Sequence, residues 1–327
     1  MQGANLAAGI AVVACAVFGS GVEPATAQHA PWRHGILEPK SDAGFAMMVT
    51  QNGFAETLGL DLKIVPLQNE NLALRALLAG ELESYDGTPP FQAFARGGNT
   101  KVLGCYWVNL PHALFVKDSI NSLADLKGKT IAASAPGTLP NLEAQAMLLH
   151  AGLQTADVAL TAGGGDADRF RALSGGVVDA AVISSEYTPL AAAAKLKPLA
   201  RAREVLPDFV RYCYITSTAV LKSRPEDVVR FLIAQSQALR YALSHRDETI
   251  ALAKSASGQK PDDPRAAFVY DDAVSAHAIN PELPLPVTTL ANMQTTLLKL
   301  GAIEKTVDVS AMVDPGPREK ALADVTK

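Results

Sequence analysis

The chain has few of the residues and motifs that mark enzymes and metalloproteins. Of its 327 residues only 3 are Cys, 6% are aromatic and 19% are charged. No G-x-S-x-G elbow occurs. No pair of histidines has the spacing of zinc ligands among His29, His34, His112, His150, His245 and His277. We therefore expect no catalytic residues, no metal and no cofactor.

Two glycine-containing segments match phosphate-binding loops only in part. Residues 128–130 (GKT) end like a P-loop, but Leu123 stands where that motif needs its first Gly. The triplet 163–165 is followed by Asp-Ala-Asp, which fits neither dinucleotide-binding nor Walker spacing. The triplet is more typical of a flexible loop before a helix.

The charge balance argues against nucleic acid as a partner. The formal net charge is −4, and no basic tail or cationic cluster is present. The first 27 residues hold one charged residue, Glu23, so the remainder carries 29 basic and 32 acidic residues, a net charge of −3. Beyond that leader no apolar run is long enough to span a bilayer.

The first 27 residues have the features of a signal peptide. An apolar run at 6–18 precedes an Ala-Thr-Ala cleavage signal at 25–27, which predicts export to the periplasm and cleavage before Gln28. No Lys or Arg precedes the run, so an uncleaved anchor is the alternative. Lipidation of Cys15 is rejected, because the Val-Val-Ala before it lacks the usual Leu and apolar sequence continues beyond it.

The remaining 300 residues alternate between strand and helix patterns, which favours parallel α/β sheets in two lobes. The expected strands are 34–37, 61–65, 82–85, 101–108, 113–116, 130–133, 158–161 and 180–184. The expected helices are 44–58, 71–78, 91–96, 142–151, 166–174, 225–244 and 289–300. The helix at 225–244 begins with Pro and two acids, a favourable first turn.

The order of several segments resembles one family over nearly the whole chain after the leader. These segments are 59–65 (GLDLKIV), 77–83 (LLAGELE), 122–130 (SLADLKGKT), 170–180 (FRALSGGVVDA), 221–225 (LKSRP) and 307–314 (VDVSAMVD). The set resembles the NMT1/THI5-like group, which includes nitrate, sulfonate and taurine solute-binding proteins (SsuA and TauA types) of ABC importers. The last segment resembles that family's tail, which packs back on the first lobe.

The resemblance implies a type 2 periplasmic-binding-protein fold. Each α/β lobe would hold a mostly parallel sheet flanked by helices, with hinge crossings near 107–112 and 212–218. Lobe 1 would comprise 28–109 and 218–327, and lobe 2 would comprise 110–217. The implied function is a monomeric receptor that closes on a small solute and presents it to a membrane permease and ATPase.

In such a fold the ligand contacts come from loops after strands and from helix amino termini. The candidate residues in these loops are Ser41, Asp42, Phe45, Asp86, Gly87, Thr88, Gly137, Thr138, Asn141, Ser184, Ser185, Glu186 and Tyr187. Helix capping is the alternative for Thr138 and Asn141, and turn formation is the alternative for Asp86. Glu186 is a candidate for a cationic ligand group, with an ordinary surface carboxylate as the alternative.

The crossings add further candidates. Tyr106, Trp107, Tyr212 and Tyr214 predict a partly aromatic cleft wall, with core packing as the alternative. His112 would donate to an anionic group or serve a structural role. No Arg stands in a predicted site loop, which favours an organic solute, aromatic or carboxylated, over a simple oxyanion.

Two cysteines outside the leader, Cys105 and Cys213, fall on the predicted crossings. An oxidising compartment would permit a disulfide between them, and free buried thiols are the alternative.

Three other functions are compatible with the fold that the resemblance implies. A thiamine pyrimidine-precursor synthase would need a Cys-rich motif, and a desulfinase would need a nucleophilic Cys in the first-strand loop; this chain has neither. A sensory binding protein that docks on a membrane kinase remains open.

Overall fold

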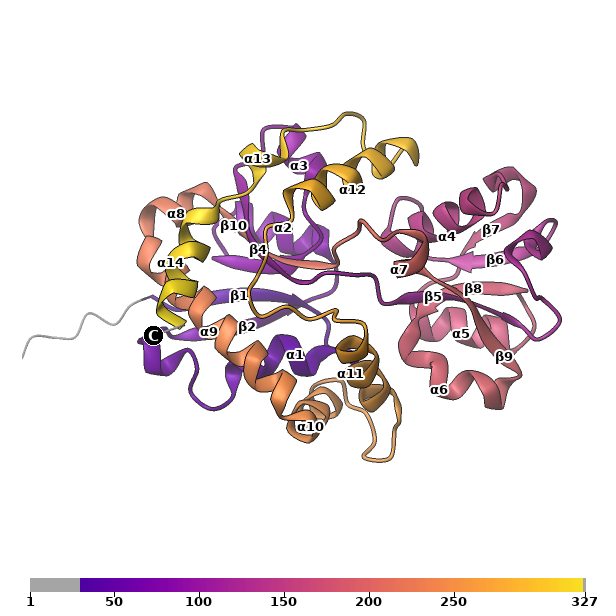
Figure 1. The fold of residues 1–327 in the computed structure, drawn as a ribbon, viewed down its shortest axis with the longest axis horizontal. Coiled ribbons are helices and arrows are strands. Elements are labelled where there is room, and N and C mark those ends of the chain that lie inside the picture. Colours follow the sequence, from indigo (N-terminus) through magenta and orange to yellow (C-terminus); the bar gives the residue numbers. More distant parts are fainter. Residues whose placement is uncertain (1–29, 326–327) are drawn as a thin grey trace, which may run out of the picture. The chain divides into compact units, whose positions relative to one another are not determined.

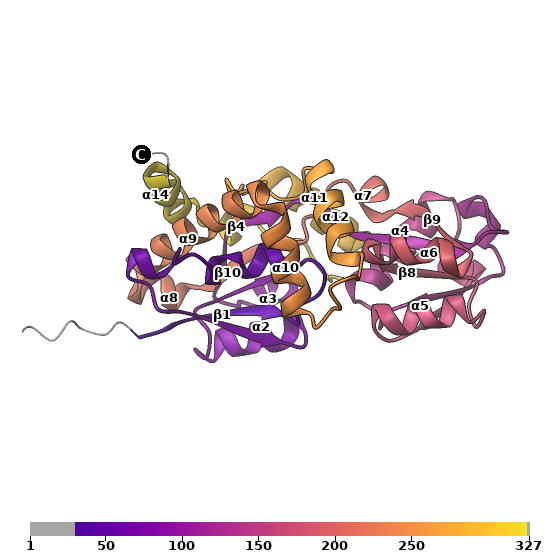
Figure 2. The ribbon, with the colours of Figure 1, turned by 90° about the horizontal axis from the view of Figure 1, so that it is seen from below.

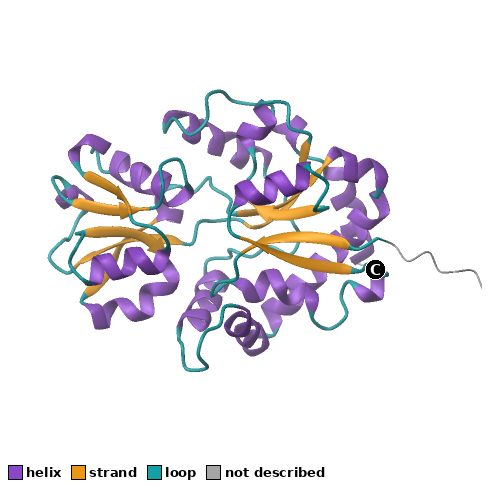
Figure 3. Ribbon diagram, turned by 180° about the vertical axis from the view of Figure 1, so that it is seen from behind, coloured by secondary structure: helices purple, strands orange, loops and turns teal. Residues whose placement is uncertain are grey.

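The computed structural model describes residues 30–325, and the predicted signal peptide lies outside them. Two five-stranded sheets form the centres of two lobes (Figures 1 and 3). The lobe 1 sheet has the order β2 (Leu62–Leu67), β1 (Trp32–Leu37), β3 (Ser84–Gly87), β10 (Tyr212–Ser217) and β4 (Thr100–Trp107). The lobe 2 sheet has the order β7 (Ala159–Ala162), β6 (Thr130–Ala133), β8 (Ala180–Ser184), β5 (His112–Lys117) and β9 (Leu196–Arg201).

One strand in each sheet runs against the others. Strand β10 is antiparallel to β3 and β4, and β5 is antiparallel to β8 and β9. The other two pairs in each sheet are parallel, so both sheets are mixed, and four of the five strands in each run in the same direction, as expected. Each reversed strand is the first strand after the chain enters that lobe. The strands next to the crossings are thus held inside the sheets.

The two crossings are the segments 108–111 and 206–211. The first matches the expected position. The second lies earlier than the expected 212–218, because residues 212–217 are hydrogen-bonded into the lobe 1 sheet as β10. The sequence of residues 212–217 (YCYITS) is compatible with a strand inside the sheet and with an extended connection between the lobes, so the sequence alone did not distinguish these two structures.

Helices cover both faces of each sheet. One face of the lobe 1 sheet is covered by α2 (Glu70–Leu78), α3 (Phe91–Ala95), α12 (Val287–Lys299) and α13 (Val309–Met312) (Figure 1). The other face is covered by α1 (Ala43–Met47), α9 (Pro225–Ser244), α10 (Arg246–Ala256), α11 (Arg265–Ser275) and α14 (Pro315–Val325). Helix α8 (Thr218–Ser223) connects β10 to α9. In lobe 2, α4 (Leu139–His150) and α7 (Ala202–Val205) lie opposite α5 (Asp166–Ser174) and α6 (Thr188–Ala191). Short 3-10 turns are η1 (Met48–Thr50), η2 (Glu56–Leu58), η3 (Leu123–Leu126), η4 (Thr155–Asp157), η5 (Ser185–Tyr187) and η6 (Ala192–Ala194).

The helix predicted at 44–58 is wrong. The α-helix ends at Met47 and is followed by isolated 3-10 turns. Asn52 and Gly53 have φ angles of 55° and 70°. Two consecutive residues in the left-handed region cannot continue a right-handed helix, and Asn-Gly is a strong turn signal. The apolar periodicity of the segment concealed that break.

Helix α9 anchors lobe 1. Its boundaries match the prediction, and Glu226 and Asp227 stand in its first turn, where carboxylates favour the helix dipole. Phe231 on its buried face stacks on Trp32 of β1, with ring centroids 5.2 Å apart.

Nowhere in residues 30–325 is there a helix with both the length and the apolar character needed to cross a membrane.

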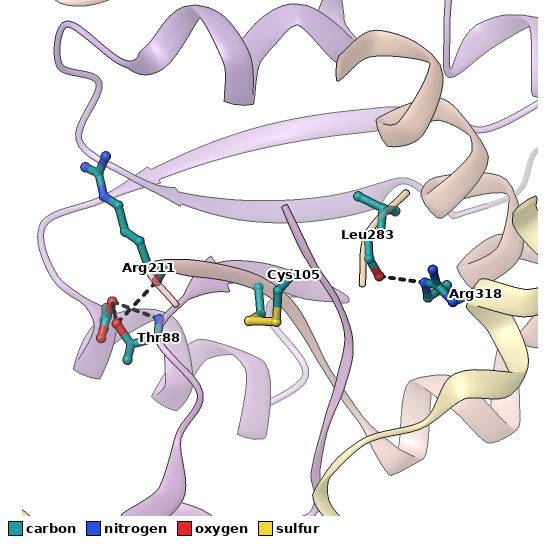
Figure 4. Close-up of a disulfide and its surroundings, with 7 residues drawn as sticks. Thr88, Cys105, Arg211, Leu283 and Arg318 are labelled. Atoms are coloured by element: carbon teal, nitrogen blue, oxygen red, sulfur yellow. Dashed lines mark hydrogen bonds between the residues drawn. A yellow bond between two sulfur atoms is a disulfide. The ribbon is translucent and has the colours of Figure 1, made fainter. Parts of the chain in front are cut away.

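The C-terminal part of the chain covers the free edge of β4. The backbone N–H of Cys105 donates to Pro284, and Asn280 donates to the carbonyl of Tyr106, both at 2.8 Å. Arg318 of α14 holds this segment through the Leu283 carbonyl (Figure 4). Val313 bridges to Val102 of β4, so the tail packs on lobe 1, as the resemblance implied. The unpaired strand edge is thereby protected.

A disulfide joins Cys105 of β4 to Cys213 of β10 (Figure 4). The two residues are register partners on neighbouring antiparallel strands. Strand β4 ends at Trp107 and β10 begins at Tyr212, so the bond lies beside the points where both crossings leave lobe 1. It ties the crossings together on the lobe 1 side and leaves their lobe 2 ends unconstrained.

We expect the Cys105→Ala/Cys213→Ala double variant to lose stability. The bond closes a sequence separation of 108 residues, so its removal should lower the free energy of unfolding by about 2–4 kcal/mol in urea denaturation. Reductant should lower the stability of the wild type similarly and leave the double variant unchanged. A wild type that is insensitive to reductant under denaturing conditions would contradict this expectation.

Candidate functional site

A cavity lies where the crossings meet the two lobes, and side chains of both lobes line it. Lobe 1 contributes Lys40, Asp42, Trp107, Val269, Asp272, Ala273 and Ala278; lobe 2 contributes His112, Asp166, Ser184, Ser185, Glu186 and Arg203; the crossings contribute Asn109, Pro111 and Arg211. A neighbouring cavity shares Lys40, Asp42 and Trp107 and extends along the loop after β1 to Asp86, Tyr106 and Tyr212. This position, at the loops after strands, is where α/β sheets bind ligands.

An ion pair between Lys40 and Asp166 joins the lobes across the cavity. Lys40 lies in the loop after β1 and Asp166 begins α5, and their charged atoms are 2.8 Å apart. Burial alone would raise the pKa of Asp166, but the charges of Lys40, His112 and Arg169 hold it well below its usual range. The carboxylate therefore stays ionised and also accepts a hydrogen bond from the backbone N–H of Ser184.

A second ion pair sits at the crossings. The guanidinium of Arg211 is 2.5 Å from the Asp42 carboxylate. It also lies over the rings of Trp107 and Tyr212, with its central carbon 4.6 and 4.3 Å from their centroids. Burial by itself lowers the pKa of Arg211, but the negative charge of Asp42 outweighs this effect, so the pKa is raised overall. Of the four residues predicted for an aromatic wall, Trp107 lines both cavities and Tyr106 and Tyr212 line the second, whereas Tyr214 lines neither. Arg211 already stacks on Trp107 and Tyr212.

A third cluster also joins the lobes. Arg203 of α7 makes two hydrogen bonds to Asp272 of α11, at 2.7 and 3.0 Å. Arg201 adds a contact to the same carboxylate at 3.2 Å. Helix α11 packs against α10 of lobe 1 and against η5 and α6 of lobe 2 (Figures 1 and 2). The Asp272 carboxylate thus lies on the helix that bridges the cleft, and both arginines come from lobe 2.

Glu186 is a buried carboxyl in η5, only 5% exposed. Burial raises its pKa most strongly and the charges of Asp42 and Asp166 add to the rise, while a hydrogen bond with Ser41 and the charge of Lys40 oppose it. The Ser41 hydroxyl faces it from lobe 1 as a hydrogen-bond partner, and Ser41 in turn accepts from the Gln259 amide at 2.7 Å. A polar chain from Gln259 to Glu186 therefore also crosses the cleft.

His112 is held by a fully buried acid. Its Nδ1 lies 3.0 Å from one oxygen of Glu143, a residue of α4 with no exposed surface. The other oxygen of Glu143 has no hydrogen-bond partner in the described part of the chain. This contact orients the imidazole, which lines the cavity.

The structure brings together many of the residues predicted from the sequence. Asp42, Trp107, His112, Ser184, Ser185 and Glu186 line the first cavity, and Asp86 lines the second. Ser41 lies beside Glu186, and Phe45 packs on Trp107 and Tyr270. Tyr187 lies near Phe170 and beneath the guanidinium of Arg265.

Other predicted residues lie outside both cavities. Tyr214 is buried and donates to Gln235, and Gly87 packs on Tyr85 at the end of β3. Thr88 bonds the Glu70 carboxylate and the Arg211 carbonyl. Gly137, Thr138 and Asn141 surround the start of α4, where Thr138 is the N-cap and Asn141 accepts from Gln145. Asp86 lines the second cavity, but its two carboxylate oxygens are already hydrogen-bonded to His34 at 2.9 Å and to Tyr106 at 2.7 Å.

The sequence analysis missed the basic side chains of the site. Arg203 and Arg211 reach the cavity from α7 and the second crossing, whereas no Arg was expected there. Arg211 directly precedes Tyr212, so a correct crossing boundary would have found it. Lys40 adjoins the predicted Ser41, but nothing in the sequence pointed to Asp272. Among residues 30–325 no cluster of three or more His, Cys, Asp or Glu side chains fits a metal ion.

We expect Asp42→Asn to destabilise the protein by about 3 kcal/mol, because it leaves the buried Arg211 guanidinium without its counter-ion. Urea unfolding measures this change. The matched control is Asp271→Asn, which breaks the exposed pair with Arg246 and should cost less than about 1 kcal/mol. Equal costs would show that the Asp42–Arg211 pair is not shielded from solvent.

We expect Glu186→Gln to raise the melting temperature of the empty protein at neutral pH. The folded-state pKa of Glu186 lies above its unfolded value of about 4.3, so its contribution to stability is present below that value and is lost as the pH rises through the folded pKa. Glutamine keeps the shape without the charge. The gain over the wild type should shrink as the pH falls toward about 4, and a pH-independent difference would contradict this cause.

Comparisons with known proteins agree with this fold. A family model described as NMT1/THI5 like matches residues 42–249, well over half of the chain. None of the curated proteins compared with the chain matches it.

Several solved structures share the fold. The periplasmic aliphatic sulphonate binding protein SsuA from Escherichia coli is 20% identical with a TM-score of 0.70, over 87% of this chain and 92% of that chain. A putative sulfonate-binding SsuA from Methylobacillus flagellatus is 18% identical with a TM-score of 0.73, over 91% and 96%. DSZB in complex with biphenyl-2-sulfinic acid is 18% identical with a TM-score of 0.68, over 89% and 99%. These similarities confirm the two-lobed periplasmic-binding-protein fold, and with the match of the family model they lead to one conclusion: the chain belongs to the NMT1/THI5-like family.

Proposed function

We propose that this protein is an extracytoplasmic solute-binding receptor of an ABC importer, which captures a small organic solute between its lobes. The observation that carries the proposal is the cavity at the crossings, because polar and charged side chains of both lobes line it. A ligand in such a cavity contacts both lobes only when they are closed. Its differential affinity then stabilises the closed form.

The contacts across the cleft support closure as the working motion. Lys40 with Asp166, Arg203 with Asp272, and Ser41 with Glu186 each join one lobe to the other. These pairs form where the lobes meet, while the disulfide and the β4–β10 pairing keep the lobe 1 side of the hinge rigid. The closed surface would be what the membrane permease recognises.

The similar structures support a receptor more than an enzyme. Two of the solved structures named above are of sulfonate-binding proteins. A further structure of DSZB with a similar fold is that of a desulfurization enzyme. A desulfinase would need a cysteine nucleophile in the loop after β1, but residues 38–42 of this loop are Glu-Pro-Lys-Ser-Asp. Cys105 and Cys213 are bonded to each other inside lobe 1. No free thiol therefore faces the cavity within residues 30–325.

The expected location follows the same proposal. A periplasmic protein works in an oxidising compartment, where a disulfide such as Cys105–Cys213 persists. Cleavage of the leader before Gln28 remains a prediction, and N-terminal sequencing of the exported protein measures it. A monomer and a permease partner complete the proposal.

Thermal unfolding of the mature protein against a solute panel tests the receptor function. The panel comprises sulfonates, nitrate, aromatic carboxylates, pyrimidines and amines. A true ligand at 100 times its dissociation constant adds about 2.7 kcal/mol to the free energy of unfolding. We expect one chemical class to stabilise the protein, to be recovered unchanged, and to reduce the radius of gyration in solution scattering. Consumption of the compound would contradict the receptor and favour an enzyme.

A further inference from the structure

Glu186 differs from the other charged residues that line the cavity. Asp42 is paired with Arg211, Asp166 with Lys40, and Asp272 with Arg203. His112 is paired with Glu143. Within residues 30–325, Glu186 has no Lys, Arg or His nitrogen within 4.0 Å of its carboxyl oxygens. Among the charged residues that line the first cavity, it is thus the one that the described part of the protein leaves without an ion pair.

The cations whose charges act on Glu186 are already bonded elsewhere, and one of them, Lys40, pairs with Asp166 at 2.8 Å. Arg265 acts on Glu186 through its charge, but its guanidinium makes hydrogen bonds to both oxygens of Asp263, at 2.8 to 3.2 Å. The hydrogen-bond partner that faces Glu186 is the neutral hydroxyl of Ser41. A carboxyl that is 5% exposed and unpaired is costly at neutral pH, which leaves room for a ligand to improve its environment.

We propose that the captured solute carries a cationic nitrogen group and that Glu186 binds it. The inference rests on the receptor function proposed above and names the chemical class of its ligand. A protonated amine or amidine would supply the missing charge and donate hydrogen bonds to the carboxylate. Charge-assisted hydrogen bonds of this kind are the stronger ones in proteins.

The basic residues of the cavity favour this assignment over a simple anion. Lys40, Arg203 and Arg211 each hold a carboxylate of the protein at 2.5 to 2.8 Å. An anionic ligand would have to compete with those carboxylates, and for Lys40 and Arg203 it would break the contacts that join the lobes. A cationic group at Glu186 leaves all three pairs intact.

A second observation points to a ligand in the same place. Trp107 lines both cavities and is 3% exposed, and its buried Nε1–H has no hydrogen-bond acceptor in the part of the chain that the structure describes. Buried donors without partners are rare in native proteins. A solute with an oxygen acceptor beside its cationic nitrogen would satisfy Trp107 and Glu186 together.

The experiment compares pairs of solutes that differ by one amino group. The pairs are 3-aminopropionate with propionate, 2-aminoethanesulfonate with ethanesulfonate, and benzylamine with benzyl alcohol. Titration calorimetry is run on mature protein that has been unfolded and refolded to remove any ligand carried through purification. We expect the amine of at least one pair to bind at least tenfold more tightly than its partner.

Three variants assign the effect to the named groups. Glu186→Gln should abolish most of the difference within the pair and still fold, as the stability prediction above measures. Glu204→Gln is the matched control: Glu204 is exposed on α7 outside both cavities, so the same loss of charge should leave the preference unchanged. Trp107→Phe should weaken both members of the pair by a similar, several-fold factor.

The outcomes separate the two proposals. Equal binding within every pair, or a preference that survives Glu186→Gln, overturns the cationic ligand and leaves the receptor standing. Native mass spectrometry of protein purified without unfolding tests the receptor itself. If that protein carries no small molecule and no panel compound binds, the receptor function is contradicted as well.

Discussion

The insertion of β10 between β3 and β4 is the constraint on which the rest of the structure depends. This strand returns from lobe 2 and is held in the lobe 1 sheet by hydrogen bonds on both sides and by the Cys105–Cys213 bond. Because β4 leaves lobe 1 beside it, the two crossings are neighbours. Trp107 and Tyr212 are register partners at this point, and Arg211 is the next residue outward. The cavity exists because these segments meet.

The cavity is built largely from compensated charge. Arg211 is enclosed by Asp42 and two aromatic rings, and Asp166 is shared by Lys40 and Arg169. The attraction within such a pair offsets the cost of removing both charges from water only when their geometry is good. Removing one partner leaves the other as an unpaired buried charge. They therefore define the relative position of the lobes as well as the polarity of the site. Glu186 stands apart, since burial raises its pKa and Lys40, whose charge opposes that rise, is paired with Asp166.

The raised pKa of Glu186 is a stability cost placed at the site. A glutamine would fit the same space without that cost, so the carboxyl serves binding better than folding. The same holds for the unpartnered Nε1–H of Trp107. Where a protein keeps buried polar groups unsatisfied, function is the usual reason. Glu186 and Trp107 both line a cavity that closes only when two lobes meet.

The sequence by itself determined the alternation of strands and helices, the boundaries of α5, β8 and α9, and the order of segments that identifies the family. Local periodicity and capping carry that information, since they act over a few residues. It also placed Asp42, Trp107 and Glu186 in loops and crossings, because carboxyl ends of strands are recognisable. Tertiary structure alone decided that β10 is a strand of lobe 1 and that Arg211, Arg203 and Asp272 reach the cavity. These depend on contacts between residues distant in sequence, and no local pattern records which charge will meet which across the cleft.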